Sequence, residues 1–171
     1  MKVLVAYYTQ TGNTEKIAKA IHQEASLANE VDLKKIGELD ATHLPSYDFI
    51  FVGSPLHAGN LTGPVKEFLN NMPTGAGKKM AGFITHFAPA YPQQAMDGFT
   101  EPLKAACRDK GMEYKGCFDC QGALTESLHE MVRKRQNLSE EQWKKMVEQM
   151  TGRPNDEDAG KARAFAREVL A

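Results

Sequence analysis

The chain has 171 residues, of which 42% are hydrophobic and 25% charged, with a formal net charge of −1 and three cysteines. This length and composition are typical of one soluble globular domain of roughly 100–200 residues. The net charge lacks the basic character of a nucleic-acid-binding protein. The sequence has no apolar run of the ~20 residues that cross a bilayer, and three cysteines are too few for a disulfide framework. We therefore expect a cytoplasmic protein with no nucleic-acid or membrane partner.

Short apolar runs alternate with amphipathic stretches along the chain. Five segments have the pattern of strands: 2–8, 31–36, 47–52 (ending at Gly53), 79–86 and 113–120. Apolar residues recur at helical spacing in 14–28, in the stretch after Pro64, in 96–106 and in the last segment after Pro154. Strands that alternate with helices predict an α/β fold, a doubly wound five-stranded parallel sheet with helices on both faces.

Residues 121–150 are not required by this alternation. Residues 121–138 are polar, and we predict an irregular segment there. Ser139-Glu140-Glu141-Gln142 has the pattern of a capping box, which predicts one short helix with Trp143 and Met146 on one side. We interpret residues 1–171 as a single domain in which 121–150 is an insert. We expect its helix to pack on the domain, with display for a partner as the alternative.

A polar loop joins the first strand to the first helix. It consists of Thr9, Gln10, Thr11, Gly12, Asn13 and Thr14. A helix N-terminus offers unpaired N–H groups and partial positive charge, and glycine lets the backbone curl around an anion. The loop contains no lysine or arginine, and it lacks the Gly-Lys-Ser/Thr ending of triphosphate sites and the Gly-x-Gly-x-x-Gly spacing of dinucleotide sites. It therefore predicts a phosphate monoester held by neutral donors.

This loop resembles the [ST]-x-T-G-x-T loop of the flavodoxin family, which binds the phosphate of flavin mononucleotide (FMN). The similarity in the order of strands and helices covers about residues 1–120 and the last helix. The resemblance implies a sheet ordered 2-1-3-4-5, with FMN bound non-covalently at the carboxyl ends of the first, third and fourth strands.

The resemblance also implies two loops that flank the flavin ring. The first contains Ser54, Pro55, Leu56, His57, Ala58 and Gly59, and the second contains Thr85, His86, Phe87, Ala88 and Tyr91. Gly59 would supply a peptide that flips toward flavin N5 on reduction. Phe87 and Tyr91 are stacking candidates that could instead belong to the core, and His57 could be an ordinary surface histidine. Two histidines near the ring would make the reduction potential sensitive to pH, which is a hypothesis.

The pair Cys117-x-x-Cys120 could indicate a redox dithiol or half of a zinc site. A second cysteine or histidine pair at ligand spacing is missing, so we predict no metal site. In a strand the two side chains would point to opposite faces with Cα atoms ~10 Å apart, beyond disulfide reach. We expect Cys120 to border the flavin side and Cys107 to be a small core residue.

Three functions compete. The first is a one-electron carrier between redox partner proteins, a monomer or weak dimer, favoured because no reaction-specific side chain stands out. The second is an FMN-dependent NAD(P)H:quinone or flavin reductase of the same fold. The third, a phosphoryl receiver, would need clustered carboxylates where Thr9, Gln10 and Thr11 stand. Family members are strongly acidic, and the net charge of −1 weakens the expectation of an acidic docking face.

Overall fold

The computed structural model describes residues 1–75 and 77–171. Its strands are β1 (Lys2–Tyr7), β2 (Glu30–Lys35), β3 (Phe49–His57), β4 (Asn60–Leu61), β5 (Lys79–His86) and β6 (Glu113–Gln121). Its α-helices are α1 (Asn13–Ala25), α2 (Gly63–Asn71), α3 (Gln93–Lys110), α4 (Glu126–Arg135), α5 (Glu140–Met150) and α6 (Asp156–Leu170). Two 3-10 helices, η1 (Ile36–Glu38) and η2 (Ala41–Ser46), lie between β2 and β3.

The sheet has the order β2-β1-β3-β5-β6, and all neighbours on this path are parallel. This confirms the predicted fold and the order 2-1-3-4-5, since β5 and β6 are the fourth and fifth predicted strands. The short strand β4 is an addition, which pairs antiparallel with the end of β3. The three inner strands are buried on both faces, which is why their sequences are almost continuously apolar.

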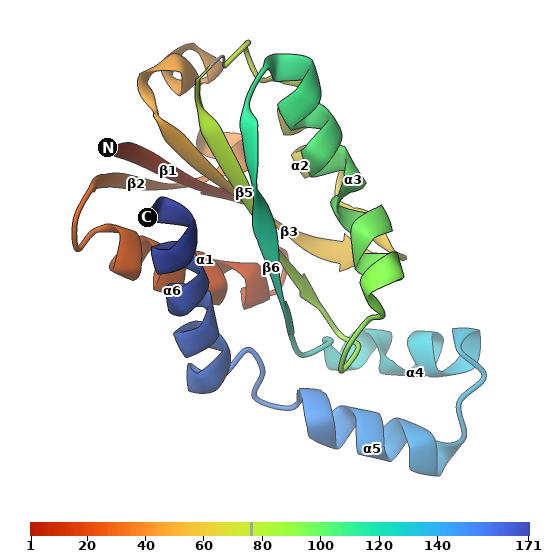
Figure 1. The fold of residues 1–171 in the computed structure, drawn as a ribbon. Helices are drawn as coiled ribbons and strands as arrows, with labels where there is room; N and C mark the ends of the chain where they lie inside the picture. The colour runs from red at the N-terminus through yellow and green to blue at the C-terminus, as the bar shows by residue number, and fades with distance from the viewer. Residues whose placement is uncertain (76) are drawn as a thin grey trace.

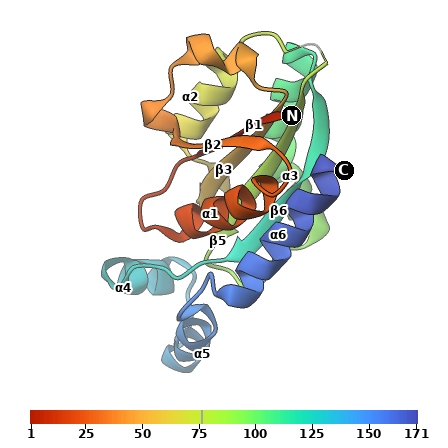
Figure 2. The ribbon, with the colours of Figure 1, turned by 90° about the vertical axis from the view of Figure 1, so that its left-hand side faces the viewer.

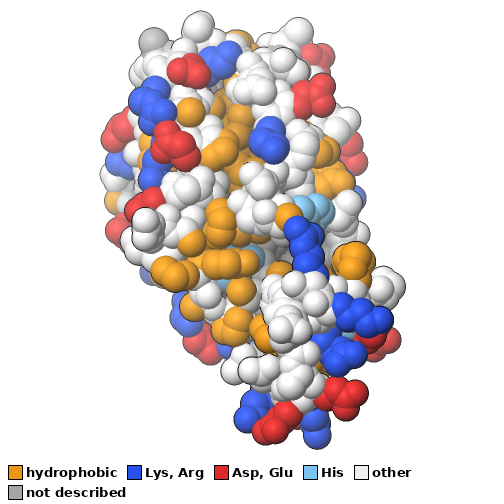
Figure 3. Space-filling model, turned by 90° about the vertical axis from the view of Figure 1, so that its right-hand side faces the viewer, with side chains coloured by type: hydrophobic (Ala, Val, Ile, Leu, Met, Phe, Trp, Pro, Cys, Tyr) orange, Lys and Arg blue, Asp and Glu red, His pale blue; other side chains and the backbone are white. Residues whose placement is uncertain are grey.

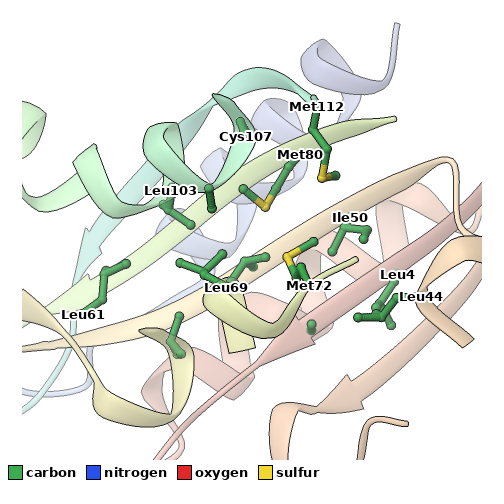
Figure 4. Packing of buried hydrophobic residues seen from close by; sticks show 14 of the residues in the cluster. Leu4, Leu44, Ile50, Leu61, Leu69, Met72, Met80, Leu103, Cys107 and Met112 are labelled. Atoms are coloured by element: carbon green, nitrogen blue, oxygen red, sulfur yellow. The ribbon is translucent and has the colours of Figure 1, made fainter. Parts of the chain in front are cut away.

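Helices cover both faces of the sheet (Figure 1 and Figure 2). Helices α2 and α3 lie on one face, where Leu4, Ile50, Met80 and Leu103 form the centre of a core (Figure 4). Helices α1 and α6 pack together on the other face, over a second core that includes Phe51 and Phe83. None of the helices in the described residues combines the length and apolar composition needed to cross a bilayer.

Strand β3 continues past Gly53, so the prediction that the strand ends there is wrong. A Cβ atom at Gly53 would lie 2.2 Å from the ring of Phe83 on the neighbouring strand. This glycine therefore makes room for an aromatic ring inside the sheet instead of ending the strand. The strand turns back only at Ala58 and Gly59, whose φ angles of 50° and 76° fit a two-residue hairpin turn of type I′.

The insert contains two helices, so the prediction of an irregular segment over 121–138 is wrong for residues 126–135. Helix α4 has no buried residue and no side-chain cap, and it therefore leaves little signal in the sequence. Helix α5 has the predicted capping box at Ser139 but buries only Met150. Trp143 packs edge-on against His129 of α4, with 5.3 Å between ring centres. The two helices form a hairpin beyond the carboxyl edge of the sheet (Figure 1 and Figure 2).

Candidate functional site

A pocket opens at the carboxyl edge of the sheet, where the ends of β1, β3 and β5 meet. Parallel strands point the same way, so the segments that follow them converge on one edge. The residues that line the pocket are Thr9, Gln10, Thr11, Asn13, Thr14, Pro55, Leu56, His57, Thr85, His86, Phe87, Gly122, Ala123, Leu124, Thr125 and Leu128. The pocket volume of about 110 Å³ is below the roughly 300–1,000 Å³ of whole ligand pockets, so its enclosed part suits the phosphate end of a nucleotide.

The loop between β1 and α1 has the geometry of an anion site. Gly12 adopts a left-handed conformation with φ 89°, and its N–H donates to the hydroxyl of Thr9 at 3.0 Å. Gly12 is also the N-cap of α1, and no side chain caps this helix. The N–H groups of the first turn of α1 thus face the loop together with neutral hydroxyl and amide side chains. These donors fit the phosphate monoester that the sequence predicts.

Two contacts fix this loop against distant parts of the chain. The hydroxyls of Thr14 and Thr85 lie 2.8 Å apart, and both residues are buried. This bond ties the start of α1 to the end of β5, so the Thr14 hydroxyl serves to position the loop. The Asn13 side chain donates to the carbonyl oxygen of Ala123 at 2.8 Å. The loop is therefore held by β5 on one side and by the insert on the other.

The insert supplies a fourth wall of the pocket that the sequence analysis missed. Its lining residues are Gly122, Ala123, Leu124, Thr125 and Leu128. A Cβ atom at Gly122 would lie 2.7 Å from the amide nitrogen of Asn13, so this position accepts only glycine without a shift of the loop. The position of Gly122, two residues after the fifth predicted strand, was the one signal in the sequence that this segment returns to the site.

The structure brings most of the predicted cofactor residues together. Three groups of predicted residues line the pocket. They are the five residues of the β1–α1 loop other than Gly12; Pro55, Leu56 and His57; and Thr85, His86 and Phe87. Ser54 does not, because its hydroxyl is buried and accepts from the backbone N–H of Thr62 at 3.1 Å. Ala58 and Gly59 form the hairpin turn outside the pocket lining.

Ala88, Tyr91 and Cys120 also lie outside the pocket lining. The ring of Tyr91 packs edge-on between His86 and Phe99, with ring centres 4.8 Å and 5.0 Å away. Of the two stacking candidates, only Phe87 therefore lines the pocket. Cys120 faces a second, polar cavity of about 430 Å³ on the other side of His86. Cys120 thus lies outside the pocket that we assign to the cofactor, with its side chain packed toward α6, and its contact with the flavin stays a prediction.

The side chains of Cys117 and Cys120 point to opposite faces of the sheet and Cys107 lies in the core, as the sequence predicts. Cys117 packs toward the core under α3 and Cys120 toward the core under α6, on opposite faces of the sheet. Cys107 is buried, and all three thiols are free. Burial raises the pKa of Cys107 to about 11 and also raises the pKa values of Cys117 and Cys120. The thiols are thus protonated at neutral pH and poorly suited to redox chemistry.

Known proteins match the chain, some of them over nearly its whole length and others over about half of it. A sequence model of the flavodoxin domain family matches residues 4–167. The flavodoxin-like domain-containing protein BilS of Clostridioides difficile is 29% identical over 177 residues, which cover 99% of this chain and 97% of that protein. A flavodoxin of Synechococcus elongatus is 35% identical over 48% of this chain and 50% of its own length. An NAD(P)H dehydrogenase (quinone) of Syntrophus aciditrophicus is 29% identical over 41% of this chain and 47% of its own length.

Solved structures share the fold. Oxidised flavodoxin 2 from Bacillus cereus superposes with a TM-score of 0.67 at 24% identity, covering 99% of this chain and 98% of that one. The apo form of the NADH:FMN oxidoreductase EMOB superposes with a TM-score of 0.61 at 13% identity, covering 98% and 87%. The strand order, the loop at the start of α1 and the match over residues 4–167 lead to one conclusion: the chain belongs to the flavodoxin domain family.

Proposed function

We propose that this protein is an FMN-binding flavoprotein that carries single electrons between redox partner proteins. One observation carries the proposal: three segments that the family resemblance assigns to the phosphate and the ring line one pocket at the carboxyl edge. Bound FMN would supply the redox chemistry, since it accepts and releases electrons one or two at a time. The protein's own residues would bind it, orient it and limit its contact with water.

Two groups of side chains divide this work. The hydroxyl and amide groups of the β1–α1 loop would hold the phosphate through neutral hydrogen bonds. Pro55, Leu56 and Phe87 give the pocket apolar surface beside these donors. The described residues that line the pocket include no carboxylate, lysine or cysteine, and no hydrogen bond joins a threonine hydroxyl of the lining to His57 or His86. This set of residues favours a carrier over an enzyme.

A second candidate is an NAD(P)H:quinone or flavin reductase with the same cofactor. A groove of about 580 Å³ lies beside the pocket and shares Thr9 with it. Tyr8, Ile36, Leu39 and Phe68 give it an apolar lining, and its volume lies in the range of small-molecule sites. Such a groove could take a substrate next to the cofactor. The similarity to an NAD(P)H dehydrogenase (quinone) supports the same alternative.

The two candidates differ in how bound FMN is reduced. The purified protein is loaded with FMN and titrated anaerobically with a reductant while its absorption spectrum is recorded. Two resolved one-electron steps, with no NADPH oxidation by the protein alone, support the carrier. A single two-electron step together with NADPH oxidation in the presence of a quinone supports the reductase. Failure to bind micromolar FMN contradicts both.

A further inference from the structure

His86, the last residue of β5, is buried in the wall between the cofactor pocket and the polar cavity. Its side chain is only 1% exposed. Ring atom Nδ1 lies 2.9 Å from the carbonyl oxygen of Ala88, and Nε2 lies 3.0 Å from a carboxylate oxygen of Asp119. Both ring nitrogens of this histidine therefore face an oxygen atom of the protein.

These two partners constrain the protons on the ring. A backbone carbonyl oxygen only accepts hydrogen bonds, and so does an ionised carboxylate. A neutral imidazole has one N–H and one lone pair, so in that form one of the two contacts would set a lone pair against an acceptor. Both contacts are satisfied when both nitrogens carry hydrogen. That form is the imidazolium cation.

The rest of the pocket lacks positive charge. The described residues that line it include no lysine or arginine, and its other titratable side chain is His57. We infer that Ala88 and Asp119 hold His86 as an imidazolium, and that this cation supplies the positive charge that a phosphate monoester in the pocket otherwise lacks. The inference rests on the proposed function, because it takes the phosphate of FMN as the anion. A charge pair in a poorly hydrated wall interacts more strongly than the same pair in water.

The charged groups near His86 are mostly paired with one another. The titratable and charged groups that line the two cavities beside His86 are Asp119, Cys120, Tyr91, His57, Arg153, Asp158 and Lys161. Arg153 pairs with Asp158 at 2.7 Å, and Lys161 pairs with Glu157 at 2.6 Å. Asp119 lines the polar cavity but not the cofactor pocket, and its side chain is 37% exposed to solvent. The counter-charge of the pair thus lies outside the lining of the pocket that would hold the anion.

The protonation state can be measured without any ligand. Nitrogen-15 NMR of the ring in the ligand-free protein at neutral pH distinguishes a doubly protonated imidazolium from either neutral tautomer. We expect both His86 nitrogens to be protonated in the wild-type protein and a neutral ring in Asp119→Asn, which removes the counter-charge from a partly exposed site. A neutral His86 in the wild-type protein overturns the inference, whether or not FMN binds.

Binding then tests the role of the cation. Dissociation constants are measured for FMN, for riboflavin, which lacks the phosphate, and for inorganic phosphate. In His86→Gln we expect FMN affinity to fall about tenfold, a loss of about 1.4 kcal/mol, while riboflavin affinity changes less than about twofold. We expect Asp119→Asn to lower FMN affinity as well. His22→Gln, on α1 and outside the pocket lining, is the matched control.

Each outcome decides the inference. Equal losses for FMN and riboflavin in His86→Gln would mean that His86 only supports the packing of the site, and they overturn the role of the charge. If His86→Gln does not fold, Asp119→Asn gives the comparison in its place. If the wild-type protein binds neither flavin, the proposed function fails. The phosphate measurement still shows whether loss of the His86 charge weakens anion binding, and unchanged phosphate affinity then overturns the inference.

Discussion

Thr11 lies in the turn at the start of α1, where it lines the pocket while remaining exposed. Thr14, three residues later, is fully buried, and its hydroxyl forms a hydrogen bond with the hydroxyl of Thr85. Two threonines of one motif therefore have different physical roles. One is free to bind a ligand, and the other positions the loop that binds it.

The first prediction separates binding from loop position at Thr11. In Thr11→Ala we expect FMN affinity to fall about tenfold, because a hydrogen bond to a charged group contributes about 1.5–3 kcal/mol. Riboflavin affinity should stay within about twofold, since it has no phosphate. Fluorescence titration with both flavins measures the two constants. Thr74→Ala, an exposed threonine outside the pocket lining, is the control, and a parallel loss of riboflavin affinity contradicts the assigned role.

At the scale of elements, the β3–β4 hairpin carries local strain. Its turn places Ala58 at φ 50°, a left-handed conformation that non-glycine residues rarely adopt, and Gly59 follows at φ 76°. Type I′ turns favour asparagine followed by glycine, because asparagine tolerates this conformation better than alanine does. The turn thus holds a suboptimal residue at a position where the chain reverses beside the pocket.

We predict that Ala58→Asn stabilises the ligand-free protein by about 0.5–1 kcal/mol, since the left-handed conformation costs an ordinary residue about 1–2 kcal/mol. Urea unfolding monitored by circular dichroism measures the change. Ala28→Asn, at an exposed alanine without a positive φ, should leave stability unchanged or lower it. A loss of stability in Ala58→Asn would show that the turn is not of type I′ in solution.

A second element-level contact joins the residue that follows η2 to β2. The hydroxyl of Tyr47 donates to a carboxylate oxygen of Asp32 at 2.7 Å. Burial, followed by this hydrogen bond and the charge of Asp32, raises the pKa of Tyr47 to about 12. The folded-state pKa thus lies above the ordinary value of about 10 in the unfolded chain. The group stabilises the fold fully below pH ~10, and this contribution is lost as pH rises from about 10 to 12.

We therefore predict that Tyr47→Phe lowers the free energy of unfolding by about 0.5–1.5 kcal/mol at pH 8 and by less above pH 11. Chemical denaturation of both proteins across this pH range measures the difference. Other tyrosines also have raised pKa values, so only the difference between the two proteins isolates Tyr47. A difference that stays constant with pH contradicts the role of ionisation.

At the scale of the whole molecule, the two chain segments that connect the helical hairpin of α4 and α5 to the rest of the domain lie side by side. The backbone N–H of Ala123 donates to the carbonyl oxygen of Arg153 at 3.0 Å, which brings its two ends together. On α4, Leu128 lines the pocket and is 38% exposed, whereas Met131 lies outside the lining and is 56% exposed. Figure 3 shows charges of both signs over this end of the molecule and apolar side chains gathered above it. The hairpin adds a wall to the pocket but little to the core.

The last prediction follows from this division. Leu128→Ala should weaken FMN binding by roughly fivefold, about 1 kcal/mol, because it removes apolar surface from the pocket wall. Its free energy of unfolding should change by less than about 0.5 kcal/mol, as for surface substitutions. Met131→Ala, one turn further along α4 and outside the lining, is the matched control. Equal effects of the two substitutions on FMN affinity contradict the pocket role of the hairpin.

The sequence by itself determined the alternation of strands and helices and the polar loop that opens the first helix, and the resemblance added the sheet order. The alternation and the loop are local features, because they depend on periodicity, capping and a six-residue motif whose donors come from consecutive residues. The capping box at Ser139 is of this kind. The opposite orientations of Cys117 and Cys120 also follow from strand geometry alone.

Only the tertiary structure decided what depends on residues far apart in the chain. Strand β3 continues through Gly53 because the ring of Phe83, thirty positions away, fills the space of the missing side chain. Asn13 reaches Ala123, and Asp119 reaches His86, because β6 ends beside β5 at the same edge of the sheet. Local sequence patterns do not predict these contacts, since packing between neighbouring strands brings the residues together only in the folded chain.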